Sequence, residues 1–165
     1  MLILVCLIPE VQGKIPKHFT NWPLHLTLAP WFELSGKELP GFLADVESIV
    51  ASYAPLQLSQ AGSATFSPSK VKVTLIKTTP EIIKLHQDLL FAIRNRHATL
   101  LSAIYTGSNY RPHITNQLNW NLPKDQVIYG NKLYLVARES ANQRKVVYDK
   151  EFSKRSSGLS TTPQH

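Results

Sequence analysis

Several stretches of the chain show the hydrophobic patterns of β-strands. The run Leu2–Ile8 is apolar throughout, which is typical of a strand covered on both faces. Elsewhere apolar and polar residues alternate with the period of two that indicates one face in a core, so that Lys72 and Thr74 are expected on a solvent face. These patterns predict further strands at about 24–32, 56–66, 70–77, 132–138 and 145–152, the last two as a hairpin across 139–144.

Two other segments carry apolar residues at helical spacing. In residues 40–53 they form one stripe, and Pro40 suits the first turn of a helix. The second helix is predicted at about 80–97, where residues 78–81 supply hydroxyl caps, a proline and an acidic side chain. His86 lies beside the apolar face of this helix, and we interpret it as a structural histidine with a satisfied ring rather than as a ligand.

The chain has 165 residues, of which 43% are hydrophobic and 18% charged, as in ordinary globular proteins. Its net charge of +7 is unevenly spread. Residues 1–69 hold three Lys/Arg and five Asp/Glu, and residues 70–165 hold fifteen and six. The basic half suits a polyanionic partner such as RNA. The alternative is that charges such as those of Lys150 and Arg155 only solvate a terminus, and both interpretations stay open.

The single cysteine, Cys6, excludes an intramolecular disulfide and a cysteine-rich zinc site. We expect it to be a buried strand residue in a reducing compartment, and we expect the protein to be cytoplasmic. The run Leu2–Ile8 also resembles the apolar part of a signal peptide, but no positive charge precedes it and no small-residue cleavage site follows it. We therefore predict a first strand. No other apolar run approaches the length that spans a membrane.

Two short blocks carry the candidate chemistry, Leu-His-Leu-Thr-Leu at 24–28 and Arg-Pro-His-Ile-Thr at 111–115. In each block a histidine and a threonine are two residues apart in a strand pattern, so their side chains share one face. The apolar residues between them face a core. If both strands face one cleft, two imidazoles and two hydroxyls meet one small anion, a site suited to acid–base chemistry on a phosphate ester. These four residues are His25, Thr27, His113 and Thr115.

The His-x-Thr spacing alone does not identify the site, because it occurs four times in the chain. The copy at His18 is predicted to lie in a loop between two prolines. The copy at His97 ends the second helical pattern, and at helical spacing His97 and Thr99 do not share a face. Only the copies at His25 and His113 have the alternation of a half-buried strand.

The expected order is strand, strand, helix, strand, strand, helix, strand, strand, strand. Each motif strand lies in its own half, which predicts an α+β fold of two pseudo-symmetric lobes. Each lobe would be an antiparallel sheet with a packed helix, and the lobes would meet at a central active-site cleft. We expect residues 1–152 to form this domain and residues 153–165, which are polar and lack periodicity, to be a disordered tail.

With these residues in place, the chain resembles the two-histidine (2H) phosphoesterase superfamily, in particular its 2′-5′ RNA ligase and cyclic phosphodiesterase branch. The resemblance rests on the blocks at 24–28 and 111–115, on their order and spacing, and on the terminal hairpin. It covers roughly residues 1–152. The chain departs from the family pattern at Asn116, where an apolar residue is usual, and at Pro30 and Trp31, which follow the first motif. Asn116 could weaken the packing of its strand or reach into the site, and Pro30 predicts a sheet edge or a bend.

The resemblance implies a metal-independent phosphodiesterase, without a cofactor, that acts on 2′,3′-cyclic phosphates or 2′-5′ linkages of RNA or nucleotides. In this interpretation His25 and His113 are the acid and base, and Thr27 and Thr115 bind the phosphate. A 5′-hydroxyl in place of water would give reversible 2′-5′ ligation. The expected partners are RNA ends or small cyclic nucleotides, with no membrane, and the expected state is a monomer. The sequence does not identify the substrate, the direction of reaction or which histidine is the base.

Residues beside the motifs are candidates for substrate contacts. Arg111 and Tyr110 lie two and three residues before the second histidine and could contact a second phosphate or stack on a base. The aromatic residues Trp22, Trp31, Tyr105 and Trp120 could stack on bases, although packing is the usual role of such residues.

Two other functions stay open. The chain could be a non-catalytic RNA-binding module that keeps the fold and the basic half, although binding alone needs no pair of proton-transferring groups. It could also be a metalloprotein using His18, His25 and His113, although no HExxH motif or cysteine pair supports a zinc site.

Overall fold

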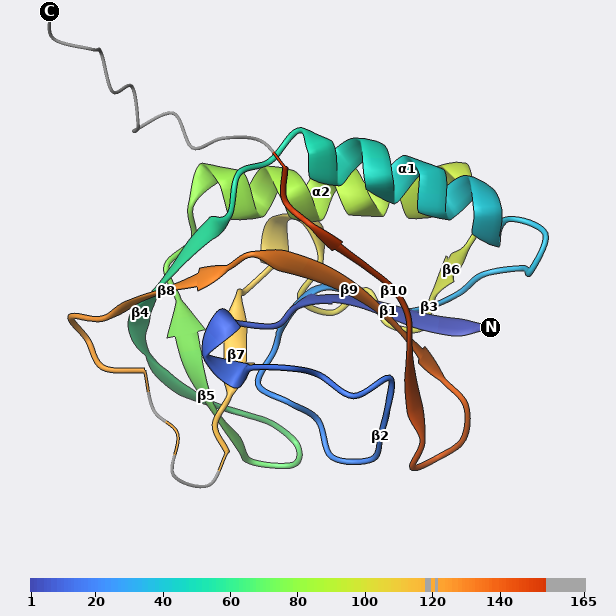
Figure 1. Cartoon of the computed structure of the whole chain (residues 1–165). Helices are drawn as coiled ribbons and strands as arrows, with labels where there is room; N and C mark the ends of the chain where they lie inside the picture. Colours follow the sequence, from blue (N-terminus) through green and yellow to red (C-terminus); the bar gives the residue numbers. More distant parts are fainter. Residues whose placement is uncertain (118–119, 121, 154–165) are drawn as a thin grey trace, which may run out of the picture.

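The structure of the protein is a computed structural model that describes residues 1–117, 120 and 122–153 (Figure 1). The predicted α+β fold is confirmed. The described elements are β1 (Leu2–Leu7), η1 (Glu10–Gln12), β2 (His18–Phe19), β3 (Leu26–Glu33), α1 (Leu39–Ala51), β4 (Leu56–Phe66), β5 (Val71–Ile76), α2 (Pro80–Asn95), β6 (Thr99–Leu100), η2 (Gly107–Asn109), β7 (His113–Thr115), β8 (Val127–Gly130), β9 (Lys132–Arg138) and β10 (Arg144–Glu151).

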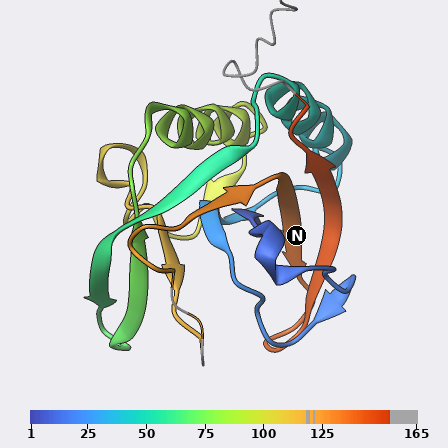
Figure 2. The same cartoon turned by 60° about the vertical axis from the view of Figure 1, so that its left-hand side comes forward.

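The strands form one curled antiparallel sheet in the order β2-β10-β9-β1-β3-β7-β5-β4-β8, with β6 paired to β3. The apolar run at the start of the chain is an inner strand, because β1 pairs with β3 on one side and with β9 on the other. β3 and β7 lie in the middle of the sheet. The strands towards its two ends, β4 and β5 at one end and β2 and β10 at the other, run away from the helices in different directions (Figure 2). The strands of the two predicted lobes thus continue through one sheet, and the pseudo-symmetry of the lobes is not confirmed.

The helices α1 and α2 lie together on one face of this sheet (Figures 1 and 2). Their apolar stripes pack on inward side chains of the strands, and this main core includes Leu26, Phe32, Phe42, Leu89 and Ile114, all fully buried. Burial of such side chains contributes about 1.5–3 kcal/mol each. The helices and the alternate residues of β3 and β7 therefore fix one face of the motif strands, which leaves the histidines on the other face.

A second, smaller core lies on the opposite face of β1 and β9. Its buried residues are Leu4, Cys6, Ile8, Phe19, Tyr134 and Val136, and Trp22 and Trp31 pack against it. The expected burial of Cys6 is confirmed, and burial raises the pKa of its thiol. This core therefore supports the face that carries the histidines and threonines.

The long elements begin and end within a few residues of the predicted positions, but three short strands are absent from the prediction. His18 and Phe19, predicted to lie in a loop, form β2 against the start of β10. The other two are β6 and β8. Thr74, predicted on a solvent face, is fully buried.

The bend expected at Pro30 is present, but β3 is not an edge strand. Ile3 of β1 pairs with Phe32, and Val5 pairs with Ala29, so Pro30 and Trp31 form a bulge in β3. The proposed tail falls almost entirely outside the described residues and stays a prediction. No helix in the described ranges is long and apolar enough to cross a membrane.

Candidate active site

The two His-x-Thr motifs meet on neighbouring strands. Leu26 of β3 pairs with Ile114 of β7 in antiparallel register, and both side chains are fully buried in the main core. Because neighbouring residues in a strand face opposite sides, the histidine and threonine of each motif face away from that core. The antiparallel direction places His25 beside Thr115 and Thr27 beside His113. Directly opposed residues in a sheet have Cβ atoms about 4.5–5.5 Å apart. The four predicted site residues are thus gathered in one small area.

Each histidine ring forms the same type of hydrogen bond to a nearby backbone carbonyl. Nδ1 of His25 lies 2.9 Å from the carbonyl oxygen of Pro23, and Nδ1 of His113 lies 2.8 Å from that of Arg111. Each partner is two residues earlier in the chain. Because a carbonyl oxygen only accepts, Nδ1 carries the proton in each ring, and the lone pair of the neutral imidazole is on Nε2. Nε2 is therefore the atom of each ring that can exchange a proton with a substrate.

Burial lowers the pKa of both histidines. Desolvation is the largest cause at His25 and at His113, and in both the hydrogen bond to the backbone opposes it. The third cause differs. Repulsion from His113 lowers the pKa of His25, whereas the charge of Arg111 lowers that of His113. The two imidazoles therefore interact electrostatically, and we expect them to titrate as a coupled pair.

An aromatic and cationic cluster packs against His25. The indole of Trp22 lies face-on at 4.4 Å between ring centroids, tilted by 30°. The guanidinium carbon of Arg144 lies 5.9 Å from the Trp22 ring centroid and 5.7 Å from that of Trp31. Gln117 donates a 2.7 Å hydrogen bond to the Trp22 carbonyl oxygen and so ties this cluster to the chain after the second motif. The Trp22 indole therefore limits the movement of the His25 ring on one side.

His113 also has an aromatic neighbour, Phe66. Phe66, at the end of β4, packs edge-to-face on His113 with ring centroids 4.6 Å apart. Tyr105 stacks on Phe66 at 5.2 Å, and the guanidinium carbon of Arg111 lies 5.1 Å from the Phe66 centroid. Tyr105 is 40% exposed. Each histidine is thus bordered by an aromatic ring that an arginine covers.

The residues proposed as substrate contacts lie in different surroundings. Arg111 is exposed beside His113, and its contact with a substrate stays a prediction. Tyr110 is half-buried, and its hydroxyl donates a 2.7 Å hydrogen bond to the Thr27 carbonyl oxygen. That hydroxyl is therefore occupied by the main chain of the first motif. Among the other aromatic candidates, Trp120 is half-buried against the main core.

Asn116 is turned away from the histidines. It follows Thr115 and so shares the core side of β7 with Ile114, where Thr74 of β5 lies opposite Ile114. The Thr74 hydroxyl donates a 2.6 Å hydrogen bond to the Asn116 side-chain oxygen. The two polar side chains satisfy each other, which also explains how Thr74 is accommodated in the interior.

The remaining His-x-Thr copies lie elsewhere. Nδ1 of His18 lies 3.4 Å from a carboxylate oxygen of Glu139. His97 follows α2 with a positive φ of 54°. Within the described parts of the chain, no three His, Cys, Asp or Glu side chains gather as metal ligands, and the proposed metal set of His18, His25 and His113 finds no support.

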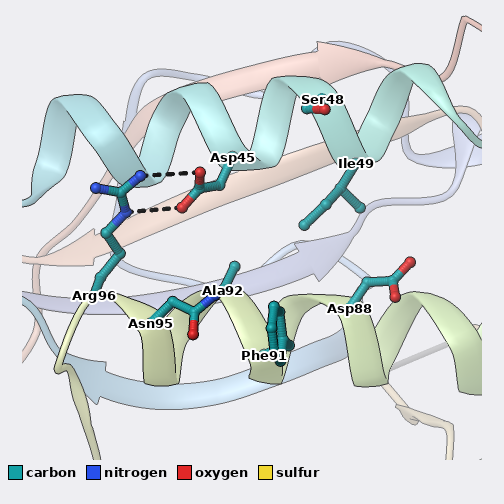
Figure 3. Close-up of a pocket in the computed structure, with 8 residues that line it drawn as sticks. All are labelled: Asp45, Ser48, Ile49, Asp88, Phe91, Ala92, Asn95 and Arg96. Atoms are coloured by element: carbon teal, nitrogen blue, oxygen red, sulfur yellow. Dashed lines mark hydrogen bonds and ion pairs between the residues drawn. The ribbon is translucent and has the colours of Figure 1, made fainter.

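Two hollows formed by described residues lie away from the histidines. One of about 310 Å³ lies between α1 and α2, where Arg96 bonds both carboxylate oxygens of Asp45 at 2.8 and 3.0 Å (Figure 3). Another, of about 300 Å³, is lined by residues of the 15–17 segment, β9 and β10. Neither is lined by a motif residue. The helix hollow holds a complete ion pair between Arg96 and Asp45, whereas the two motifs converge on the other face of the sheet.

Sequence reasoning missed two residues of these clusters, Phe66 beside His113 and Arg144 over the Trp22 and Trp31 rings. Phe66 reaches His113 only because β5 pairs with β4 on one side and with β7 on the other. Arg144 is the first residue of β10 and was predicted to be the last residue of the hairpin turn. No local pattern marks either residue, since both contacts depend on which strands become neighbours.

The comparisons with known proteins show the family and the fold of the chain. The model of the 2′-5′ RNA ligase superfamily matches residues 8–128, a range that contains both motifs, and it supports phosphoesterase activity. No curated protein matches the chain.

Similar solved structures show the same fold. One, a phosphoesterase, has a TM-score of 0.61 at 12% identity, and the match covers 92% of this chain and 98% of that chain. Escherichia coli LigT complexed with 3′-AMP has a TM-score of 0.56 at 13% identity, with 92% and 98% covered. LigT complexed with NADP+ has a TM-score of 0.57 at 12% identity, with 92% and 97% covered.

Proposed function

The chain belongs to the 2′-5′ RNA ligase superfamily of two-histidine phosphoesterases, and we propose that it is a metal-independent phosphodiesterase. Its proposed substrates are 2′,3′-cyclic phosphates or 2′-5′ linkages of RNA or nucleotides. One observation carries the proposal. The pairing of Leu26 with Ile114 brings both His-x-Thr motifs to one face, and both histidines have Nδ1 bonded to a carbonyl oxygen and Nε2 left for proton transfer.

Hydrolysis of a cyclic phosphate needs two proton transfers. The oxygen of water forms a bond to phosphorus while Nε2 of one histidine takes the proton of that water. The bond between phosphorus and one ribose oxygen breaks, and the other histidine, protonated at the start, gives its proton to that oxygen. The product is a phosphomonoester with a free neighbouring hydroxyl. Proton exchange with solvent then restores the two histidines, His25 and His113.

The threonine hydroxyls stabilise the charge that grows on the non-bridging oxygens. Thr27 and Thr115 are half-buried next to the opposite histidine, from where each can donate a hydrogen bond to the phosphate. If a 5′-hydroxyl attacks in place of water, the same proton transfers join two RNA ends through a 2′-5′ linkage, and the reverse reaction cleaves it. No nucleoside triphosphate is needed, because the cyclic phosphate retains the energy of the strained ester.

The proposed setting follows from the same features. The partners would be RNA ends or small cyclic nucleotides, attracted by the net charge of +7. We propose that the protein acts as a monomer in the cytoplasm and uses no cofactor. The buried, single Cys6 is compatible with a reducing compartment.

A non-catalytic RNA-binding module is the second candidate, favoured by the basic half of the chain. The arrangement of two imidazoles with both Nδ1 atoms fixed argues for catalysis, since binding of a polyanion needs charge and not a proton-transferring pair. RNA affinity that is unchanged in His25→Ala and His113→Ala, without turnover of any phosphodiester by the wild type, would favour the binding module.

The direct test is turnover of a 2′,3′-cyclic mononucleotide in EDTA, with the products resolved by chromatography. We expect a single phosphomonoester product, and its 2′ or 3′ position identifies which ester bond the acid faces. Turnover that EDTA abolishes and added divalent metal restores would contradict the metal-independent mechanism. If no mononucleotide is hydrolysed, RNA with a 2′,3′-cyclic end and 2′-5′ dinucleotides are the next substrates, and inactivity on all of them would contradict the proposed activity.

A further inference from the structure

The hydrogen-bonded ladder of β3 has an opening between its two partners on one side. β3 pairs with β7 at Leu26, and with β6 at Phe32 and Glu33. Between these pairs, two carbonyl oxygens of β3 accept hydrogen bonds from side chains. The Thr27 carbonyl accepts from the hydroxyl of Tyr110, and the Leu28 carbonyl accepts from Nδ1 of His86 at 2.6 Å. Side chains therefore complete this stretch of the first motif strand.

His86 uses both ring nitrogens. It is fully buried on α2, where Nδ1 contacts the Leu28 carbonyl and Nε2 accepts a 3.0 Å hydrogen bond from the Gly107 backbone N–H. Since a carbonyl only accepts and an N–H only donates, the ring is the neutral tautomer with its proton on Nδ1. Burial lowers the pKa of His86, which favours the same neutral form. The ring thus joins α2, the first motif strand and the loop at Gly107.

Tyr110 packs against His86. The two rings are stacked with centroids 3.8 Å apart and planes 7° apart, and the Tyr110 hydroxyl reaches the Thr27 carbonyl at 2.7 Å. Tyr110 is three residues before His113, and Thr27 lies beside His113 across the strands. The stacked pair of His86 and Tyr110 therefore connects the segment that precedes the second motif to the backbone of the first motif.

This link matters because β3 and β7 share a short ladder, in which Leu26 pairs with Ile114. Phosphoryl transfer depends on the placement of the proton-transferring groups, and a displacement of about 1 Å can cost about a hundredfold in rate. We propose that His86 and Tyr110 are positioning residues that hold His113 in register with Thr27. The inference rests on the proposed function, but neither residue transfers a proton in that mechanism.

The test compares two tyrosines that each lose one hydroxyl. Tyr110→Phe keeps the stack on His86 and removes the hydrogen bond to the Thr27 carbonyl. Tyr53→Phe is the matched control, because the Tyr53 hydroxyl donates a 2.6 Å hydrogen bond to Asp88 of α2 and not to the backbone of a motif strand. We expect kcat on a 2′,3′-cyclic nucleotide to fall about tenfold in Tyr110→Phe with KM within twofold, and to stay at the wild-type value in Tyr53→Phe. Equal kcat values in the two variants would overturn the inference.

The role of His86 is tested with two replacements that differ in their capacity for hydrogen bonds. Gln supplies one donor and one acceptor, as the neutral imidazole does, whereas Leu supplies neither. We expect His86→Gln to recover most of the kcat that His86→Leu loses. If His86→Leu does not fold, His86→Gln and Tyr110→Phe still decide the question. Leu89→Ala, which opens the core one turn further along α2, controls for lost stability and should retain kcat where it is folded.

A measurement without turnover separates this inference from the proposed function. The imidazole NMR signals of His113 should move in Tyr110→Phe and stay in place in Tyr53→Phe. Movement in Tyr110→Phe alone supports the positioning role even if the wild type hydrolyses none of the substrates. Unmoved His113 signals in both variants would overturn it, whatever the wild type hydrolyses.

Discussion

His25 and His113 form the same type of backbone hydrogen bond but have different neighbouring side chains. Each Nδ1 is bonded to a carbonyl oxygen two residues earlier, so the motifs share one device for fixing the tautomer. The neighbours differ, because the indole on His25 belongs to a second core, whereas the phenyl ring on His113 is next to the partly exposed Tyr105. The backbone bond therefore determines which nitrogen reacts, and the neighbouring side chains determine how firmly each ring is held and how it titrates.

The largest expected effect comes from removing either imidazole. His25→Ala and His113→Ala should each lower kcat/KM on a 2′,3′-cyclic nucleotide about 10³–10⁴-fold, since each removes one proton-transfer group. Circular dichroism should show an unchanged fold, because both side chains lie on the face away from the main core. His18→Ala and His97→Ala remove the histidines of the other His-x-Thr copies and should be active. Activity lost in these controls, but retained in the first two variants, would place the site elsewhere.

The threonines come next. Thr27→Val and Thr115→Val keep the shape of the side chain and remove the hydroxyl, which should lower kcat about a hundredfold through lost stabilisation of the phosphate oxygens. Thr99→Val, in the copy at His97, is the matched control. Steady-state kinetics separate the effects on kcat and KM. A large loss in Thr27→Val without one in Thr115→Val would show that the two motifs do not bind the phosphate alike.

A smaller effect should distinguish the two aromatic neighbours. Phe66→Leu and Trp22→Leu each remove the ring beside one histidine, and we expect kcat to fall about threefold to tenfold in both as the imidazole gains freedom. Trp22 also packs edge-on against Phe19 and Trp31, so its replacement should in addition lower the free energy of unfolding by about 1–3 kcal/mol. Denaturant unfolding measures this difference, and equal losses of stability in both variants would contradict it.

The smallest effect concerns pH. Burial lowers the pKa of both histidines, so both are mainly neutral at pH 7 in the free enzyme, and the form with one protonated imidazole becomes populated as the pH falls. We therefore expect a bell-shaped profile of kcat/KM with its maximum below about pH 6.5, the ordinary histidine value. A flat profile from about pH 5 to 9 would contradict two-histidine catalysis.

Arg111 allows a finer test of the same profile. Its positive charge lowers the pKa of His113, so Arg111→Gln should move one limb of the profile to higher pH. Lys84→Gln removes an equal charge on α2, where the ammonium pairs with Asp88, and should leave the limb in place. A limb that moves equally in both variants would mean that net charge, and not Arg111, sets the pKa of His113.

The elements with strong local patterns could be predicted from the sequence. The amphipathic stripe of 40–53 gave a helix that runs from Leu39 to Ala51, and the apolar run at 2–8 gave an inner strand. Short strands such as β2 could not be predicted, because two residues carry no periodicity and pair only where a partner strand passes. Thr74 was misplaced for a related reason. Its polarity indicated solvent, but Asn116, distant in sequence, satisfies its hydroxyl in the interior.

The candidate site shows the same division. The strand alternation predicted which side chains share a face, and the model of the superfamily matches a range that includes both motifs. Which strands become neighbours was not encoded locally, so the phenyl ring of Phe66 beside His113 was missed. The role of His86 was partly predicted. Its ring is satisfied, as expected, but its partners on β3 and at Gly107 come from long-range packing.

The most direct test of the central claim is the kinetics of the double variant His25→Ala/His113→Ala beside the two single variants. If the two imidazoles act as one acid–base pair, removing the second adds little once the first is gone, because the remaining group no longer has a partner. We predict that kcat/KM of the double variant on a 2′,3′-cyclic nucleotide in EDTA lies within about tenfold of the weaker single variant. Losses that multiply, or a single variant that retains wild-type activity, would contradict the account.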